Sequence, residues 1–261
     1  MTKNNAFFKT WVSNAHRYIN PLAESESRLD LLKNQQFIDL MERAPCVVFI
    51  INHATSRYEF FSKNVKAEMG YTAEEMLEGG VALGMSVIDE SHHEPMGKYI
   101  IPNMFTYFSD FAERKELKKV KVAYNFKFRR KDGQVRWTLH QMSVIETDES
   151  GGPLLSMVFM SDVTALKKDD RLDFSISKLN DEGFYDPIFT TSYPDDQPST
   201  LTLREWDIVS LINSGKTSAE MAEKLFLSEH TVKNHRKNIL RKFEASNTAH
   251  LLDICRRKGI L

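Results

Sequence analysis

The sequence predicts an α+β protein of two domains, and three patterns along the chain support that fold class. Apolar residues recur at helical spacing between residues 5 and 44. From residue 46 onward the apolar residues instead form short runs separated by turn residues, as strands do. After residue 200, two threonines are each followed three residues later by glutamate, a spacing that marks helix starts. We therefore expect N-terminal helices, an antiparallel sheet with helices, and a separate all-α domain.

Composition limits the classes of protein to which the chain can belong. The 261 residues are 41% hydrophobic and 27% charged, with a net charge of −1, which is typical of a soluble globular protein. Residues 1–199 contain 24 Lys and Arg against 29 Asp and Glu, whereas residues 200–261 contain 11 against 7. A negatively charged partner such as a nucleic acid is therefore expected at the C-terminal part.

Cysteine content and apolar runs exclude further classes. Cys46 and Cys255 are too few for a disulfide framework or a cysteine-rich zinc site. The longest apolar run, Cys46–Ile51, is far shorter than a membrane-spanning helix, and Met1–Tyr18 lacks a signal-peptide core. We expect a cytoplasmic protein that binds neither a membrane nor a metal.

Helices and strands follow one another in the N-terminal part. The helical pattern of residues 5–44 is interrupted near Pro21, so we expect two helices, with residues 1–35 as a helical extension. Turn residues at 131–133 and 148–152 join the last three strands into an antiparallel meander, and helices fill the gap before it. Five strands are expected, at Cys46–Asn52, Arg57–Phe61, Val122–Arg130, Val135–Glu146 and Leu154–Asp162.

An acidic stretch separates the two domains. Residues 172–199 contain six carboxylates, one lysine and three of the eight prolines. This composition predicts a linker, which we place at residues 167–199. Its apolar residues, among them Phe174, Ile176 and Phe189, are too many for a fully solvated tether, so we expect parts of it to pack on a domain.

The C-terminal domain, residues 200–261, is predicted to contain a helix, a short turn and a second helix, followed by further helices. Thr202 and Thr217 stand at capping-box positions, and Gly215 falls where the first helix should stop. Ser228 is well placed to cap a third helix that runs to about Phe243.

The third helix of this domain has two different faces. At about 100° per residue, Val232, Ile239 and Phe243 fall close together and form a buried stripe. The opposite face is basic and includes an amide, and the major groove of DNA admits a helix of this width. A solvated basic face on a small helical bundle explains the same pattern. The residues of this face are His230, Lys233, Asn234, Lys237 and Arg241.

Three segments resemble the LuxR/GerE-type helix-turn-helix, namely Leu201–Glu205, Gly215–Ala222 and Leu227–His235. The resemblance covers residues 201–261 and implies that the third helix enters the major groove of double-stranded DNA. It also implies a fourth helix from Asn247 to Leu261 that forms a dimer contact, although core packing explains its apolar residues too. Trp206 departs from the family, which usually has a charged residue there. The implied base-facing residues are Lys233, Asn234 and Lys237, and the implied phosphate contacts are Thr231, Arg241 and Lys242.

The N-terminal module resembles a PAS domain over residues 36–166. This resemblance rests on the order of the elements, which is a strand pair, then helices, then a meander. It also rests on two segments, the hairpin Phe128–Trp137 and the ending Met160–Thr164. PAS domains sense through a pocket between the sheet and its helices, or simply dimerise. The resemblance therefore implies a homodimer and allows a small-molecule ligand. The segment Thr164–Leu179 resembles the signalling helix that often leaves a PAS sheet.

Three residues are candidates to line such a pocket: Asn125, His140 and Met142. His140 and Met142 share a strand face because side chains alternate along a strand. Ordinary sheet residues on a covered face explain all three equally well, and an empty or lipid-like pocket stays open.

Two cofactors can be weighed against the sequence. A light-sensing flavin domain of this fold would need a reactive cysteine in an Asn-Cys-Arg-like helix, and no such motif occurs. Haem would need an axial ligand, for which His92 and His93 are the candidates, but adjacent histidines on a helix point in different directions. The sequence does not identify a cofactor.

No enzyme signature is present, and we expect no catalytic residues. Gly79–Gly84 lacks the spacing of a phosphate-binding loop, and the pair His92 and His93 lacks the spacing of zinc hydrolases. The acidic cluster, threonine and lysine of a phosphoryl-accepting receiver domain are missing too, which disfavours phosphorelay control.

These patterns together predict a homodimeric transcription regulator in which the PAS module controls the DNA-binding domain. The competing class is a PAS-based protein-interaction module with only weak, non-specific DNA binding. One expected mechanism is that the acidic linker docks on the basic domain and competes with DNA.

Overall fold

The computed structural model describes residues 30–193 and 201–257. The chain divides into two compact units, residues 1–174 and 175–261, and each is described by itself. The helix expected before Pro21 and the end of the expected linker lie outside the described residues.

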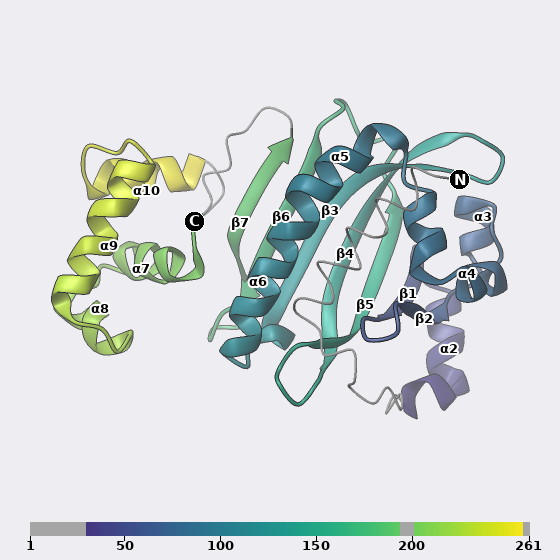
Figure 1. Cartoon of the computed structure of the whole chain (residues 1–261), viewed down its shortest axis with the longest axis horizontal. Helices are drawn as coiled ribbons and strands as arrows, with labels where there is room; N and C mark the ends of the chain where they lie inside the picture. Colours follow the sequence, from purple (N-terminus) through teal and green to yellow (C-terminus); the bar gives the residue numbers. More distant parts are fainter. Residues whose placement is uncertain (1–29, 194–200, 258–261) are drawn as a thin grey trace. The chain divides into compact units, whose positions relative to one another are not determined.

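Five antiparallel strands form the centre of the first unit (Figure 1). They are β1 (Val47–Asn52), β2 (Arg57–Phe61), β3 (Val120–Arg129), β4 (Val135–Thr147) and β5 (Pro153–Asp162). Their spatial order is β2-β1-β5-β4-β3, and each pair of neighbours is antiparallel. The predicted hairpin and the predicted meander are therefore confirmed.

One face of this sheet is covered near β1 by the N-terminal helical segments. The segments are η1 (Asp30–Lys33) and α2 (Gln35–Glu42). Asn34 caps α2 by accepting hydrogen bonds from two backbone amides of its first turn. Ile38 and Met41 of α2 pack against the buried Val48 and Ile50 of β1. Because strand side chains alternate, Phe49 between them points to the opposite face.

The opposite face is covered by the helices that lie between β2 and β3 in the sequence. Phe105, Phe108 and Phe111 of α6 are fully buried, and α6 runs along the sheet in Figure 1. Thr72 and Glu75 form a capping box at the start of α4. These elements are α3 (Val65–Met69), α4 (Ala73–Ser86), η2 (Glu90–His92), α5 (His93–Pro95), the π-helical η3 (Met96–Ile100), α6 (Ile101–Glu113) and η4 (Leu117–Lys119).

The expected signalling helix at Thr164–Leu179 is wrong, because one strand forms within this segment and a second strand follows it. They are β6 (Leu172–Leu179) and β7 (Tyr185–Tyr193), which extend the sheet to seven strands in the order β2-β1-β5-β4-β3-β6-β7. Leu172, Phe174 and Ile176 are buried while the residues between them are polar, and this period of two is that of a strand. The structure thus replaces most of the expected linker with a hairpin.

The second unit contains the all-α domain, whose predicted helix starts are confirmed. The helices are α7 (Leu203–Asn213), α8 (Ser218–Lys224), α9 (Glu229–Lys242) and α10 (Thr248–Arg257). Thr202 with Glu205 and Thr217 with Glu220 form complete capping boxes, so each threonine satisfies a free amide of the first turn.

Three histidines of the first unit, His53, His92 and His140, have pKa values that desolvation lowers. The ring nitrogen Nε2 of His53 lies 2.8 Å from Ser156 Oγ, and Nδ1 of His92 accepts a hydrogen bond from the backbone amide of Lys127 at 2.8 Å. Desolvation by burial lowers the pKa of His53 and of His92 to about 4, and that of His140 to about 3. All three are therefore neutral in the folded protein near pH 7.

Two turn glycines with the same backbone conformation offer a test of the packing around α6. Gly133 and Gly151 both have φ of +89°, but an added Cβ at Gly133 meets nothing within 4 Å, whereas one at Gly151 would lie 2.7 Å from the carbonyl oxygen of Ala112. Gly133→Ala should cost roughly 1–2 kcal/mol through backbone strain alone. Gly151→Ala should cost at least about 1 kcal/mol more, because backbone atoms must move. Urea denaturation of both variants measures the difference, and equal losses would contradict this packing.

The three histidines make stability depend on pH. The unfolded chain protonates them below about pH 6.5, but the folded chain does so only near pH 4 or below. In that interval the unfolded state binds more protons. The free energy of unfolding should thus fall on acidification, by on the order of 1 kcal/mol per pH unit for each histidine.

Urea denaturation between about pH 7 and about pH 5 measures this slope. His140→Leu should remove about a third of it, whereas His230→Gln, at an exposed position of α9, should leave it unchanged. A wild-type stability that does not change over this range would refute the assignment of neutral buried histidines.

Candidate DNA-binding face and ligand pocket

The orientation of α9 is determined at its start and along its buried side. Ser228 Oγ accepts a hydrogen bond from the backbone amide of Thr231 at 3.0 Å and so caps the helix. Val232 and Ile239 are fully buried and Phe243 is 7% exposed, as the helical wheel predicted. Since this stripe packs inside the domain, the opposite side of α9 must face outward.

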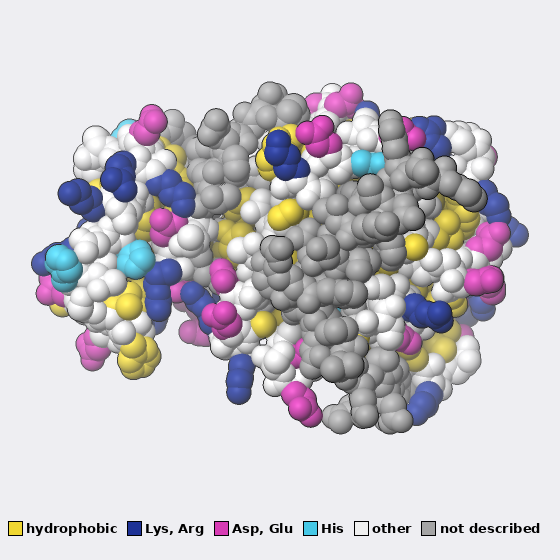
Figure 2. All heavy atoms as spheres, viewed as in Figure 1, with side chains coloured by type: hydrophobic (Ala, Val, Ile, Leu, Met, Phe, Trp, Pro, Cys, Tyr) yellow, Lys and Arg dark blue, Asp and Glu magenta, His cyan; other side chains and the backbone are white. Residues whose placement is uncertain are grey.

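The outward side of α9 holds a row of cations. Lys233, Lys237 and Arg241 are exposed and stand four residues apart, so they follow one line along the helix. Asn234, also exposed, lies beside this row. Figure 2 shows several Lys, Arg and His side chains gathered over this domain on the face in view. The structure therefore brings four of the sequence-predicted residues together on one accessible face.

The cations of this face are held only loosely by other side chains. Lys233 Nζ lies 2.7 Å from Glu229 Oε1 on the preceding turn, but the Lys233 side chain is 62% exposed, and such surface pairs contribute little. Arg241 donates to the amide oxygen of Asn238 at 3.2 Å. Both cations can therefore exchange these partners for a phosphate or a base at small cost.

The two other predicted DNA contacts are more strongly engaged within the domain. Lys242 Nζ lies 2.7 Å from Oε2 of Glu205, the capping-box residue of α7, and this ion pair joins α9 to α7. Although burial alone raises the pKa of Glu205, the hydrogen bonds from Lys242 and Thr202 bring it below its ordinary value. The hydroxyl group of Thr231 lies 2.7 Å from that of Ser228 at the start of α9. A structural role for Lys242 explains its position without DNA.

Arg236 is a residue whose role the sequence patterns missed. Its Nη1 donates to Ser218 Oγ of α8 at 2.8 Å, and its Nη2 donates to Thr248 Oγ1 of α10 at 3.3 Å. A single guanidinium group therefore holds three helices together. The residue stands beside the basic face in sequence, so only the folded domain distinguishes it from its exposed neighbours.

The structure gives a reason for tryptophan at position 206, where the LuxR/GerE-type domains that the sequence resembles usually have a charged residue. Its side chain is 9% exposed, and the indole Nε1 donates a hydrogen bond to the backbone oxygen of Pro187 in β7 at 3.3 Å. The hairpin of β6 and β7 thus contacts the domain through α7. This contact is made by α7, and the expected docking of the acidic linker onto the basic face of α9 stays a prediction.

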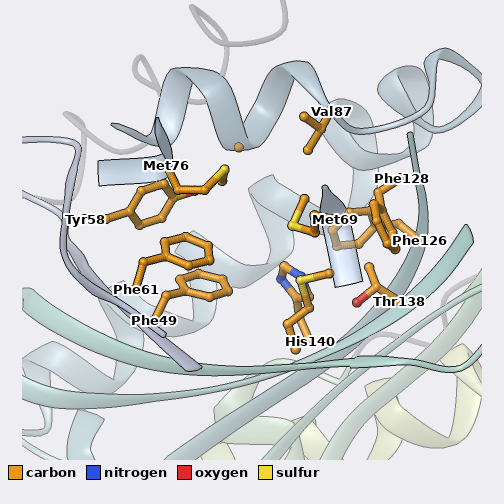
Figure 3. A pocket seen from close by; sticks show the side chains of 12 residues that line it. Phe49, Tyr58, Phe61, Met69, Met76, Val87, Phe126, Phe128, Thr138 and His140 are labelled. Atoms are coloured by element: carbon orange, nitrogen blue, oxygen red, sulfur yellow. The ribbon is translucent and has the colours of Figure 1, made fainter. Parts of the chain in front are cut away.

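An apolar cavity of about 40 Å³ lies between the sheet and the helices of the first unit (Figure 3). Phe49 and Phe61 stack at its wall with ring centroids 4.8 Å apart. The volume holds a few water-sized molecules, so a larger ligand needs side chains to move, and the flexible Met69 and Met76 are suited to that. The residues lining it are Phe49, Tyr58, Phe61, Met69, Met76, Gly84, Val87, Phe126, Phe128, Thr138, His140 and Met160.

His140 contributes a polar ring to the lining of this otherwise mostly apolar cavity. Figure 3 shows its ring rising from the sheet toward the cavity. Its ring centroid lies 4.7 Å from that of Phe126, 5.4 Å from that of Tyr124 and 5.6 Å from that of Phe49. Nε2 is buried and has no hydrogen-bond partner among the described residues. A buried nitrogen without a partner is costly, and a ligand that hydrogen-bonds to it would relieve that cost.

The other two candidate pocket residues do not line this cavity. Asn125 lies on the other face of β3, where it donates to Asp173 Oδ2 at 2.6 Å and accepts from the Asp173 amide at 3.0 Å. The expectation for Asn125 is therefore wrong, because its amide satisfies the backbone at the start of β6. Met142 is buried on the same strand face as His140 but outside the set of residues that line the cavity.

The two haem candidates also lie elsewhere. The His92 ring packs at 5.1 Å from Trp137 and uses Nδ1 to bind the Lys127 amide, and His93 Nε2 lies 2.9 Å from the backbone oxygen of Ile88. Neither lines the cavity. In the part of the chain that the structure describes, no group of three or more His, Cys, Asp or Glu is arranged to hold a metal ion. The described helices also include none with the length and apolar content needed to cross a membrane.

Several solved structures are similar to parts of this chain. The VqmA dimer of Vibrio cholerae, a LuxR-type receptor, is 14% identical, and the match covers 87% of this chain and 89% of VqmA with a TM-score of 0.33. The PAS domain of a Colwellia psychrerythraea protein is 15% identical over 52% of this chain and 99% of that domain, with a TM-score of 0.37. At these scores neither similarity bears on the function of this chain.

Curated relatives match the C-terminal domain. The response regulatory protein YgeK of Escherichia coli is 42% identical over 60 residues, which are 23% of this chain and 41% of YgeK. LiaR of Bacillus subtilis, a transcriptional regulatory protein, is 48% identical over 48 residues, 18% of this chain and 23% of LiaR. AlkS of Alcanivorax borkumensis, a transcriptional regulator, is 33% identical over 63 residues, 24% of this chain and 7% of AlkS. The chain thus spans less than half the length of these relatives.

A family description covers the same segment as these relatives. The GerE family, described as bacterial regulatory proteins of the luxR family, matches residues 199–255. The match includes α7, α8, α9 and most of α10, together with the three caps described above. The C-terminal domain of this chain is therefore a helix-turn-helix domain of the luxR family.

Proposed function

We propose that this chain is a homodimeric, sequence-specific transcription regulator of the cytoplasm. The observation that carries the proposal is the exposed row of Lys233, Lys237 and Arg241 with Asn234 beside it, on the third helix of a luxR-family domain. A helix with this face fits the major groove, where lysine can bind guanine and asparagine can bind adenine. The names of the relatives, which are regulators of transcription rather than enzymes, support the same conclusion.

The residues of α9 have different roles in this proposal. Lys233, Asn234 and Lys237 face the base edges, because they lie in the first three turns of α9 and the N-terminal end of a recognition helix enters deepest. Arg241, about one turn beyond Lys237, meets a phosphate. Thr231 meets a phosphate through its hydroxyl group. Lys242 contributes mainly by keeping α9 on α7 through Glu205.

Dimerisation is the second part of the proposal. Two copies of the chain would place two recognition helices on half-sites related by a two-fold axis. In α10, Leu251 and Cys255 are used for the core of the domain. Leu252 and Ile254 are only partly buried, and they provide the apolar side chains that a second copy can cover.

The cavity of the first unit is the proposed sensor. Its walls are aromatic and sulfur-containing, and His140 Nε2 is the buried polar atom that a ligand can reach. A fitting ligand is therefore small, uncharged and largely apolar, with one group that hydrogen-bonds to a neutral imidazole. Burial raises the pKa of Tyr58, whose phenol also lines the cavity and stays neutral.

Selection of DNA from a random pool tests the DNA-binding proposal. The wild-type chain should enrich one two-fold-related sequence, whereas a PAS-based interaction module with weak DNA binding should enrich none. With the enriched duplex, Lys233→Ala and Asn234→Ala should each cost on the order of 1–3 kcal/mol and relax the sequence preference. Arg241→Ala should weaken all sequences similarly. Arg57→Ala removes an exposed charge from β2 and serves as the control; equal binding by all four variants would overturn the assignment.

Native mass spectrometry of freshly purified protein tests the sensor proposal. The wild-type chain should be a dimer with the excess mass of a small retained ligand. His140→Leu should lose that mass and remain a dimer, because it removes the hydrogen-bonding nitrogen but keeps an apolar side chain. His230→Gln, outside the cavity, should retain the ligand. A wild-type dimer without excess mass, or retention by His140→Leu, would contradict the proposed site.

A further inference from the structure

Three helices of the C-terminal domain end in the same kind of turn. After α7, the amide of Gly215 bonds to Ile212 O and the next amide bonds to Leu211 O. The same pair of bonds occurs after α8 at Phe226 and after α9 at Glu244. Each of the three residues is left-handed, with φ of +74°, +54° and +50° respectively. This is the Schellman motif, in which the left-handed residue is usually glycine.

Phe226 is an unfavourable choice for such a turn. The left-handed conformation is unfavourable in free energy for any residue with a Cβ, and aromatic residues are rare in it. The cost is not recovered by packing, because the Phe226 side chain is 95% exposed. In the turn after α7 the equivalent position is occupied by a glycine, Gly215, as is usual for this motif. Neither the fold of the domain nor its stability therefore accounts for a phenylalanine at this position, and a strained, exposed residue of this kind points to a function.

The position of Phe226 indicates which partner covers it. It lies in the turn between α8 and α9, two residues before Ser228, the cap of α9. The base-facing Lys233 and Asn234 stand on the first turns of the same helix. A residue just before the recognition helix lies at the rim of the groove that the helix enters. That rim is apolar in part, because it exposes deoxyribose carbons and thymine methyl groups, and phenylalanine is one of the residues that contact thymine methyls.

We propose that Phe226 is a DNA-contacting residue, whose ring packs on the apolar rim of the major groove beside the base pairs that Lys233 and Asn234 contact. The inference rests on the proposed function, since it needs α9 to be the recognition helix. It adds an apolar contact to an interface that is otherwise made of cations, hydroxyl groups and an amide. The contact also explains why the turn keeps a strained residue where glycine would suffice.

Replacement of Phe226 by glycine tests the proposed DNA contact without destabilising the turn. The full-length Phe226→Gly variant should melt at the same temperature as the wild type or higher, since it has the ordinary residue of the turn. Its affinity for the duplex most enriched by the wild-type chain should fall five- to tenfold in fluorescence anisotropy. Glu244→Gly is the matched control, because it relieves the same conformation at the far end of α9; its affinity should be unchanged or higher. Phe226→Tyr keeps the ring and should keep the affinity.

The salt dependence of binding identifies the kind of contact. Phe226→Gly should lower the affinity while leaving the slope of log K against log salt unchanged, because no phosphate contact is lost. Arg241→Ala, which removes a proposed phosphate contact, should lower both the affinity and the slope.

Two results would overturn the inference. One is unchanged affinity of Phe226→Gly for the selected duplex, including the case in which transcription in cells falls, which would indicate a protein partner for Phe226. The other is an equal loss of affinity in Glu244→Gly. If the wild-type chain enriches no sequence at all, the proposed function fails first, and that failure is distinct from either of these.

Discussion

The alternation of side chains along the strands is the constraint on which the first unit depends. It directs Val48 and Ile50 of β1 toward α2 and sends Phe49 between them to the other face, into the cavity wall. The same period directs Thr138 and His140 of β4 into the cavity and Asn125 of β3 away from it. A shift of one residue in the register of β4 would exchange the two faces and remove the polar centre of the cavity.

The C-terminal domain obeys the corresponding rule for helices. Burial of Val232 and Ile239 leaves only one side of α9 outside, so the core of the domain determines which cations are accessible. The caps strengthen this arrangement by fixing where each helix begins. Arg236 and Lys242 show the limit of the rule, since both are basic residues of α9 whose partners are other helices of the domain.

Polar contacts between elements explain two features of the structure that hydrophobic periodicity does not predict. The paired hydrogen bonds between Asn125 and Asp173 hold the beginning of β6 beside β3. The indole of Trp206 satisfies the backbone oxygen of Pro187 in β7, an edge strand, where proline is tolerated. Such contacts join residues far apart in the sequence, so no local pattern predicts them.

Local patterns in the sequence were sufficient for the elements whose determinants are local. The capping threonines, the stripe of α9, the hairpin turns at Gly133 and Gly151 and the strands β1 to β5 all depend on residues within a few positions of one another. The linker prediction follows the acidic and proline residues of this segment, whereas the alternation of Leu172, Phe174 and Ile176 is that of a strand. Only the tertiary structure decided that His140 faces the cavity and Asn125 does not, that Lys242 pairs with Glu205, and that Phe226 is left exposed. The physical reason is that burial and pairing are properties of two surfaces brought together, and one sequence segment contains only one of them.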